Sequence, residues 1–219
     1  MKWLLAIGVL LLTALGVWQL QRLGWKKDLI ARVEQRVHAP AIAAPDSTGD
    51  ELREFEYRAV TLRGRFLNDR ETLVQAVTRL GGGFWVMTPL HTESSMTVLV
   101  NRGFVRTAQR ATRDWARIDG EVTVNGLLRL SEPGGGFLRD NQPRQERWYS
   151  RDVAAIGRAR GVELAPYFVD AAADPAAPGQ GPVGGLTVLK FSDNHLQYAL
   201  TWFALALLLA VGSFRILRQ

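Results

Sequence analysis

Two long runs of apolar residues stand near the two ends of the chain. The first extends from Trp3 to Leu20 and is interrupted only by Gln19 near its end, and the second extends from Leu196 to Phe214 without a charged residue. At 1.5 Å per residue the second run reaches about 28 Å, close to the roughly 30 Å thickness of a bilayer's hydrocarbon layer. The pattern therefore predicts two transmembrane helices.

The first run has a second interpretation. Lys2, the apolar run and the small-x-small triplet at residues 14–16 also fit a signal peptide with a cleavage site. However, apolar residues continue at helical spacing beyond Gly16, through Leu23 and Trp25, and aromatic, Gln and Arg residues at the end of a span are typical of an interfacial anchor. We therefore favour a retained span.

Beyond the first span, the apolar residues from Gln21 to Val37 keep a helical period, which predicts an amphipathic continuation of the same helix. The next stretch, HAPAIAAPDSTGD, is rich in proline and small residues and reads as a linker. The predicted organisation is a first helix with its extension at 1–37, a linker at 38–50, a domain at 51–191, and a second span with a short tail at 192–219.

The domain reads mainly as strands, because alternating or β-branched and aromatic stretches are bounded by turn signals. The predicted strands are at 56–67, 71–80, 84–90, 96–105, 121–130, 163–170 and 186–191. One helix is predicted between residues 147 and 161, with Ser150 or Asp152 as its N-cap and Gly161 at its end. The predicted fold class is a membrane protein with two transmembrane helices flanking a β-rich α+β extramembrane domain, arranged as an antiparallel meander or small barrel.

Composition limits the chemistry. The chain has no cysteine, which excludes disulfides and thiolate metal sites, and its net charge of +6 suits anionic headgroups, carboxylate ligands or acidic protein faces. No phosphate loop, zinc helix or nucleophile elbow is present, and neither His38 nor His91 stands in a pattern that nominates a catalytic base. We expect a protein that is not an enzyme.

Five arginines recur between residues 102 and 117, namely Arg102, Arg106, Arg110, Arg113 and Arg117. Such a cluster is usually a solvated face, and a docking surface for a protein partner is the alternative. No recognition helix or basic-aromatic platform accompanies it, so we expect no nucleic-acid partner.

His195 stands at the start of the second span. At 100° per residue it shares one helix face with Tyr198 and Trp202. Ser192, Asp193 and Asn194 are all competent N-caps, and the positive end of the helix dipole near them favours the neutral imidazole, which is the form that binds metal. Metal ligation and an ordinary contact with lipid headgroups are both compatible with this spacing.

Trp18, Gln19 and Arg22 close the first span on the same side of the membrane. Their spacing places them in one patch, which faces His195 if the two spans pack together. An arginine there can bind a carboxylate such as a haem propionate with its planar fork, or it can extend to lipid phosphate.

Several segments resemble a known family, in order and at similar separations. They are GVWQLQRLGWKKDLI, EYRAVTLRGRF, VLVNRGFV, WYSRDVAAI and NHLQYALTWFALA. Together they are similar to the surfeit locus protein 1 family of cytochrome c oxidase assembly factors, and the resemblance covers nearly the whole chain.

The resemblance implies a protein that binds haem a and assists its delivery to cytochrome c oxidase subunit I, with haem a synthase as a further candidate partner beside the membrane lipids. The family's haem ligand, in its His-Leu-x-Tyr motif, falls on His195. Tyr198, Trp202 and Trp18 are then expected to pack against the porphyrin, with Gln19 beside it and Arg22 as a propionate partner. The chain departs from common family residues at Phe104, Arg106 and Asp193, of which the last leaves the ligand intact. A haem-free scaffold that stabilises oxidase assembly intermediates is the alternative.

The resemblance also implies a location in the bacterial plasma (inner) membrane, with the central domain periplasmic and both termini cytoplasmic. A count of positive charges opposes this, because Arg22, Lys26 and Lys27 follow the first span on the domain side. We accept the implied topology, since domains well beyond about 60 residues are translocated largely regardless of charge.

Overall fold

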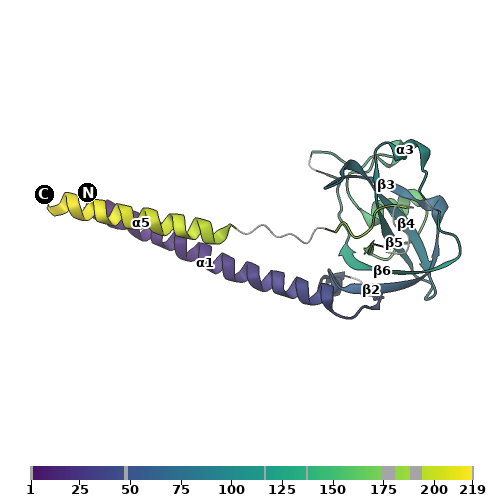
Figure 1. Cartoon of the computed structure of the whole chain (residues 1–219), viewed down its shortest axis with the longest axis horizontal. Coiled ribbons are helices and arrows are strands. Elements are labelled where there is room, and N and C mark those ends of the chain that lie inside the picture. Colours follow the sequence, from purple (N-terminus) through teal and green to yellow (C-terminus); the bar gives the residue numbers. More distant parts are fainter. Residues whose placement is uncertain are drawn as a thin grey trace. The chain divides into compact units, whose positions relative to one another are not determined.

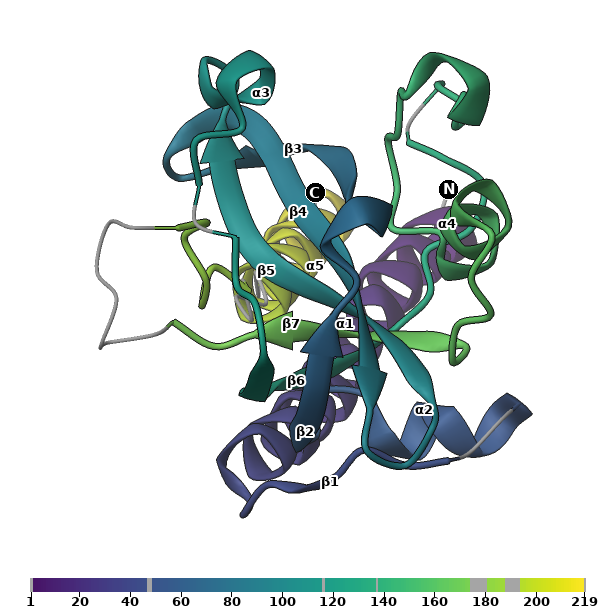
Figure 2. The ribbon, with the colours of Figure 1, turned by 90° about the vertical axis from the view of Figure 1, so that its right-hand side faces the viewer.

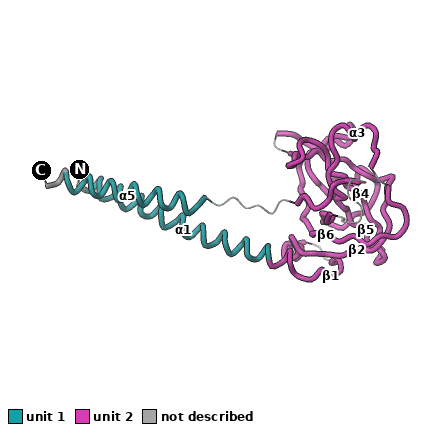
Figure 3. The backbone as a smooth tube through the Cα atoms, viewed as in Figure 1, with its two compact units in different colours: residues 1–34, 189–219 teal, residues 35–188 magenta. Residues whose placement is uncertain are grey.

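The computed structural model describes residues 2–46, 49–115, 117–136, 138–173, 181–187 and 194–218. It divides into two compact units, one comprising Met1–Glu34 with Leu189–Gln219 and the other Gln35–Val188 (Figure 3). Ser192 and Asp193, two of the predicted N-caps, lie outside the described residues. So does most of the strand predicted at 186–191.

The first unit is built from two long helices, α1 (Lys2–His38) and α5 (His195–Arg218), which run along each other in opposite directions (Figure 1). α1 continues unbroken from the apolar run into the amphipathic extension, as predicted. Both helices are long and apolar enough to cross a membrane, over Trp3–His38 and His195–Arg215. The backbone carbonyl of Asn194 accepts from the Tyr198 amide at 3.1 Å, so α5 begins directly after Asn194.

Small residues allow α1 and α5 to approach closely. A Cβ atom on Gly16 would lie 2.6 Å from the ring of Phe203, and a Cβ on Gly8 would lie 2.9 Å from Leu209. On α5, Ala199 is buried in the same interface. Packing of small residues against large ones is the usual way in which helices associate in lipid, where no hydrophobic effect drives them together.

The outer surface of these helices is apolar. Trp3, Leu4 and Leu208 are 84%, 73% and 69% exposed. In water, each such side chain would forgo roughly 1.5–3 kcal/mol of burial energy, whereas in a bilayer it is already among hydrocarbon chains. Two transmembrane helices flanking a sheet-rich domain are therefore the fold class of this chain.

The described part of the second unit contains seven strands. They are β1 (Ile42–Ala43), β2 (Ala59–Phe66), β3 (Thr72–Thr78), β4 (Gly81–Thr92), β5 (Thr97–Arg106), β6 (Glu121–Leu130) and β7 (Tyr167–Ala171). Short helices α2 (Leu52–Phe55), α3 (Gln109–Thr112) and α4 (Val153–Arg160) connect them, with 3₁₀ turns at Gly49–Glu51, Asn68–Arg70 and Pro143–Gln145. β1, which pairs in parallel with β2, lies inside the predicted linker.

Five of these strands close into a barrel (Figure 2). The sheet order is β1-β2-β6-β7-β5-β4-β3, and an additional pairing of β2 with β4 joins the two halves into a ring. The ring is antiparallel except for β5 and β7, which run in parallel. Gly64 of β2 stands where the ring closes, opposite both Thr92 and Val122, and a Cβ there would lie 2.1 Å from a β4 carbonyl oxygen. Glycine is needed at this close approach of two backbones.

Strands β5 and β7 are buried on both faces. Val100 and Val169 point into the barrel, where all five strands contribute to one apolar cluster. Leu99 and Phe168 point outward, where they pack with Trp148, Val153 and Ile156 beneath α4. Since alternate residues of a strand share a face, Asn101 and Asp170 extend this outer face beyond the apolar cluster.

Helix α4 has the ends that the sequence predicts. The Asp152 carboxylate accepts from the Ala155 amide at 2.9 Å, and Gly161 adopts a left-handed conformation with φ of +65° after the last turn. The structure thus selects Asp152 over Ser150 as the N-cap. The helix begins at Val153, later than the predicted start near residue 147.

The arginine cluster does not form a uniformly solvated face. Arg106, Arg110, Arg113 and Arg117 are exposed, as expected. Arg102 is buried, because its guanidinium pairs with the buried carboxylate of Glu71 at 3.5 Å and lies over the Phe66 ring. Burial lowers the pKa of Arg102, against the opposing effect of the Glu71 charge. The prediction of a solvated side chain was wrong at this position, because strand β5 turns residue 102 inward.

Candidate functional site

The first candidate site lies where α1 and α5 meet. His195, the first residue of α5, places its Nδ1 atom 2.8 Å from the side-chain amide oxygen of Gln19 on α1. The two residues are brought together by the packing of Gly16 against Phe203, one to two turns deeper in the helix pair. The two patches that the sequence places on the two spans therefore meet in the structure.

This contact indicates which ring nitrogen of His195 carries a proton. An amide oxygen can only accept a hydrogen bond, so the Nδ1 atom of His195 carries the proton and donates it to Gln19. In the neutral ring with this tautomer, the lone pair is on Nε2. A histidine that ligates a metal through one nitrogen almost always donates its other N–H to an oxygen acceptor in this way.

The other residues predicted for this site differ in how far their side chains are exposed. Trp18 and Tyr198 are 50% and 54% exposed, so their rings present flat surface on the outside of the two helices, and Trp202 is half-buried. Arg22 is exposed and lies over the Trp25 ring at 4.9 Å. Two cavities among the described residues are lined by residues of the other unit.

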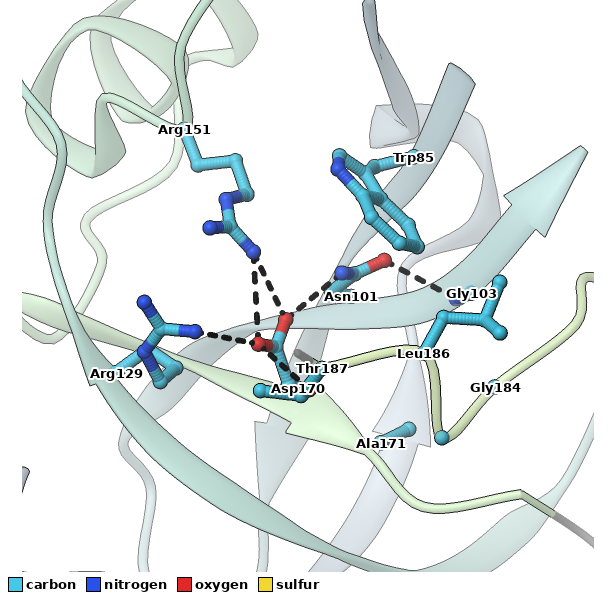
Figure 4. Close-up of a pocket in the computed structure, with 11 residues that line it drawn as sticks. Trp85, Asn101, Gly103, Arg129, Arg151, Asp170, Ala171, Gly184, Leu186 and Thr187 are labelled. Atoms are coloured by element: carbon cyan, nitrogen blue, oxygen red, sulfur yellow. Dashed lines mark hydrogen bonds and ion pairs between the residues drawn. The ribbon is translucent and has the colours of Figure 1, made fainter. Parts of the chain in front are cut away.

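The second candidate site is a buried ion network in the barrel domain. The Asp170 carboxylate accepts hydrogen bonds from Arg129 at 3.1 Å, Arg151 at 3.1 Å, Asn101 at 2.8 Å and Thr187 at 3.0 Å (Figure 4). Asp170 is only 4% exposed. A buried carboxylate requires such partners, because an unpaired charge in the interior costs several kcal/mol.

Arg151 connects this network to Glu132, whose carboxylate it binds through two nitrogen atoms. Burial alone would lower the pKa of Arg151, but the hydrogen bonds to Glu132 and the charge of Asp170 outweigh burial and raise that pKa. Arg129 stacks over Tyr57 and Arg151 over Phe168, at 4.8 and 4.6 Å from the ring centres. Both guanidinium groups are thus held in fixed positions.

Reasoning from the sequence missed this network. Its signal is a charged residue inside or at the end of an otherwise apolar strand, as in LLRL around Arg129 and YFVD at Asp170. Charges in such places are rarely tolerated unless they are paired. The sequence does not show which residues pair, because the partners come from three separate strands and two loops.

Comparison with known proteins agrees with this architecture of two spans and one β-barrel domain. The sequence profile of the SURF1 family matches residues 6–207. The chain is 38% identical to human surfeit locus protein 1 over 225 aligned positions, which cover 94% of this chain and 74% of the human one. It is 36% identical to the mouse protein, covering 94% and 72% of the two chains. It is 35% identical to a SURF1-like protein of Monosiga brevicollis, covering 88% and 78%.

The fold defines a membrane protein with two paired spans and one β-barrel domain. The chain belongs to the SURF1 family. Membership supports a role in cytochrome c oxidase assembly, in agreement with the resemblance seen in the sequence.

Proposed function

We propose that this protein binds haem a at His195 and assists its delivery to subunit I of cytochrome c oxidase. The observation that carries the proposal is the contact between His195 and Gln19, which orients the imidazole and directs its Nδ1–H to Gln19, so that the lone pair of the neutral ring is on Nε2. When bound, haem a supplies an iron that takes such a nitrogen as an axial ligand. Haem a synthase is the proposed donor of the haem.

The neighbouring residues suit a flat, amphipathic ligand. Tyr198, Trp202 and Trp18 offer aromatic surface on the helix pair, and the exposed Arg22 offers a guanidinium for a propionate. Because Trp18, Tyr198 and Arg22 are exposed on the helix pair, a ligand held by them can enter and leave without the helix pair unfolding. Binding for transfer requires this property.

We also propose a topology for the chain. Both termini lie in the cytoplasm and the barrel domain in the periplasm of a bacterial inner membrane. Reporter fusions after residue 187 and at the C-terminus should then give opposite signals. Signals from the same compartment would contradict two spans, and a cytoplasmic signal from the domain would contradict the orientation.

The haem proposal is tested on the full chain, purified in mild detergent from cells that make haem a. We expect a Soret band that is lost in His195→Ala and retained in His38→Ala, which removes another histidine at the far end of α1. Gln19→Leu should weaken haem binding by about 10- to 100-fold, the usual effect of removing a group that orients a ligand. Gln21→Leu, two residues away on the exposed side, should not.

A haem-free scaffold is the second candidate, and a specific observation favours it. Arg106, Arg110, Arg113 and Arg117 are exposed together on and after the end of β5, as a surface for an acidic partner would be. If colourless wild-type protein restores oxidase assembly in a deletion strain, the scaffold explains the function and the haem proposal is wrong.

A further inference from the structure

The barrel domain contains a cavity at the point where β5 and β7 part. Their parallel pairing ends at Asn101 and Asp170. Immediately afterwards Gly103 adopts φ of +131°, a conformation that other residues rarely adopt, and β5 turns away. The divergence opens a gap on the outer face of the barrel.

Residues 181–187, here called the strap, close this gap from one side. Val183 exchanges two backbone hydrogen bonds with Phe104 of β5 at 3.0 and 2.9 Å, and the Gly185 amide donates to Ala171 of β7 at 3.0 Å. The strap fits only because Gly103 has no side chain, since a Cβ there would lie 2.4 Å from the carbonyl carbon of Val183. The strap therefore crosses from one diverging strand to the other.

A cavity of about 220 Å³ remains beneath the strap (Figure 4). One part of its wall is polar and consists of Asn101, Arg129, Arg151, Asp170 and Thr187. The other part is largely apolar and includes Trp85, Ala171 and Leu186. At about 30 Å³ per water molecule, the space suits a small ligand of a few heavy atoms.

Arg129 in the polar wall has unused hydrogen-bonding capacity. The oxygens of Asp170 are saturated, and Arg151 is committed to Glu132 and Asp170. Arg129 donates one hydrogen bond to Asp170, while its NH2 group lies 3.9 Å from Glu132, too far for a hydrogen bond. The Nε atom of Arg129 is buried and has no hydrogen-bond partner among the described residues. A buried donor without a partner requires an explanation.

We propose that this cavity binds the carboxylate of a small ligand, with Arg129 as its partner and the apolar wall around a short hydrocarbon part. Two guanidinium groups and one carboxylate line the cavity, and the Glu132 carboxylate, which binds Arg151 from outside the lining, brings the charge of the network to zero. A network without excess positive charge suits a monoanion better than a doubly charged phosphate. A cation would find the carboxylate of Asp170 already saturated. Trp85 and Leu186 favour a ligand with at least one methyl group.

Such a carboxylate can come from a free organic acid or from the C-terminal end of a peptide. N-acetylalanine represents both, and its neutral amide differs from it only in the carboxylate. On the full chain in mild detergent, the NMR signal of the Trp85 indole N–H, assigned by comparison with Trp85→Phe, should shift saturably with N-acetylalanine. The neutral amide and inorganic phosphate should not shift this signal.

Two arginine variants test the proposed partner. Arg129→Lys keeps the positive charge beside Asp170 but removes the Nε–H and the planar fork, so it should weaken N-acetylalanine binding about tenfold or more. Arg158→Lys, on the exposed side of α4, should leave binding unchanged. If Arg129→Lys does not fold, hydrogen exchange on the wild type decides. N-acetylalanine should then slow exchange of the strap amides, and the neutral amide should not.

A pentapeptide ending in alanine separates the two sources. Binding at least tenfold tighter than that of N-acetylalanine identifies a protein end as the ligand, and equal or weaker binding identifies a small acid. The proposal is overturned if no carboxylate gives a saturable shift, if the amide binds equally well, or if folded Arg129→Lys binds as the wild type does. His195→Ala should not alter any of these results, so this inference is independent of the haem proposal.

Discussion

Replacing Asp170 by asparagine tests whether the buried ion network holds the barrel together. The substitution keeps the size of the side chain but removes the negative charge that Arg129 and Arg151 share at 3.1 Å each. Breaking a buried ion pair by removing one partner costs about 3–5 kcal/mol. Arg151 keeps its bonds to Glu132, so we expect a loss at the lower end, about 3 kcal/mol.

That loss is large compared with the total of about 5–15 kcal/mol typical of a folded domain. For a chain of this size, it corresponds to a decrease in Tm of about 6–12 °C. Urea denaturation of the full chain in mild detergent, followed by tryptophan fluorescence, measures it. Asp119→Asn provides the control, because Asp119 forms an exposed ion pair with Arg117 and its loss should change stability by less than about 0.5 kcal/mol. A change below about 1 kcal/mol in Asp170→Asn would refute the reasoning.

Three further substitutions probe the packing and titration of the fold. Gly103→Ala places a methyl group against the strap at a positive φ and should destabilise the domain by about 3 kcal/mol in the same urea assay, whereas Gly82→Ala, in open space, should not. Burial raises the pKa of Tyr167, whose hydroxyl donates to a backbone carbonyl, so stability present below about pH 10 is lost as the pH rises further. Urea curves at pH 9 and 11 measure this alkaline loss of stability, and Tyr167→Phe should abolish it. At neutral pH the same substitution should lower the free energy of unfolding by about 1 kcal/mol. Gly16→Leu should weaken the helix pair by about 1–3 kcal/mol in an SDS titration followed by circular dichroism, while Gly24→Leu, with nothing nearby, should leave it intact.

Local patterns in the sequence were enough to predict most of the helices and strands. The strands at β2, β3, β5 and β6 lie within or beside their predicted ranges, because alternation and turn residues act over a few positions. The cap of α4 at Asp152 was likewise readable, since an N-cap is a contact between neighbours in the chain. The same holds for the helical periodicity that carries α1 out of the first span.

Contacts between distant segments were not readable. The pairing of β2 with β4 that closes the barrel and the parallel pairing of β5 with β7 depend on how strands far apart in sequence align. The burial of Arg102 and the network around Asp170 follow from those pairings, so they were missed together. Gln19 and His195 are 176 residues apart, yet the sequence placed them in patches that face each other if the two spans pack together, and in the structure their side chains are in contact. This neighbourhood could be anticipated because two spans that end at the same membrane surface leave few alternative neighbours.

The hydrogen bond between His195 and an uncharged amide, that of Gln19, is suited to a haem that must later be released. A carboxylate on Nδ1 would make the imidazole more basic and strengthen its bond to a metal, and an ionised group near the membrane would add a desolvation cost. The amide of Gln19 orients the ring and selects the Nε2 lone pair without adding charge. On the proposed function, the histidine is therefore positioned to ligate iron but is not strengthened as a ligand. Haem bound in this way can be exchanged for the permanent ligands of the oxidase, which a carrier requires and a resident haem site does not.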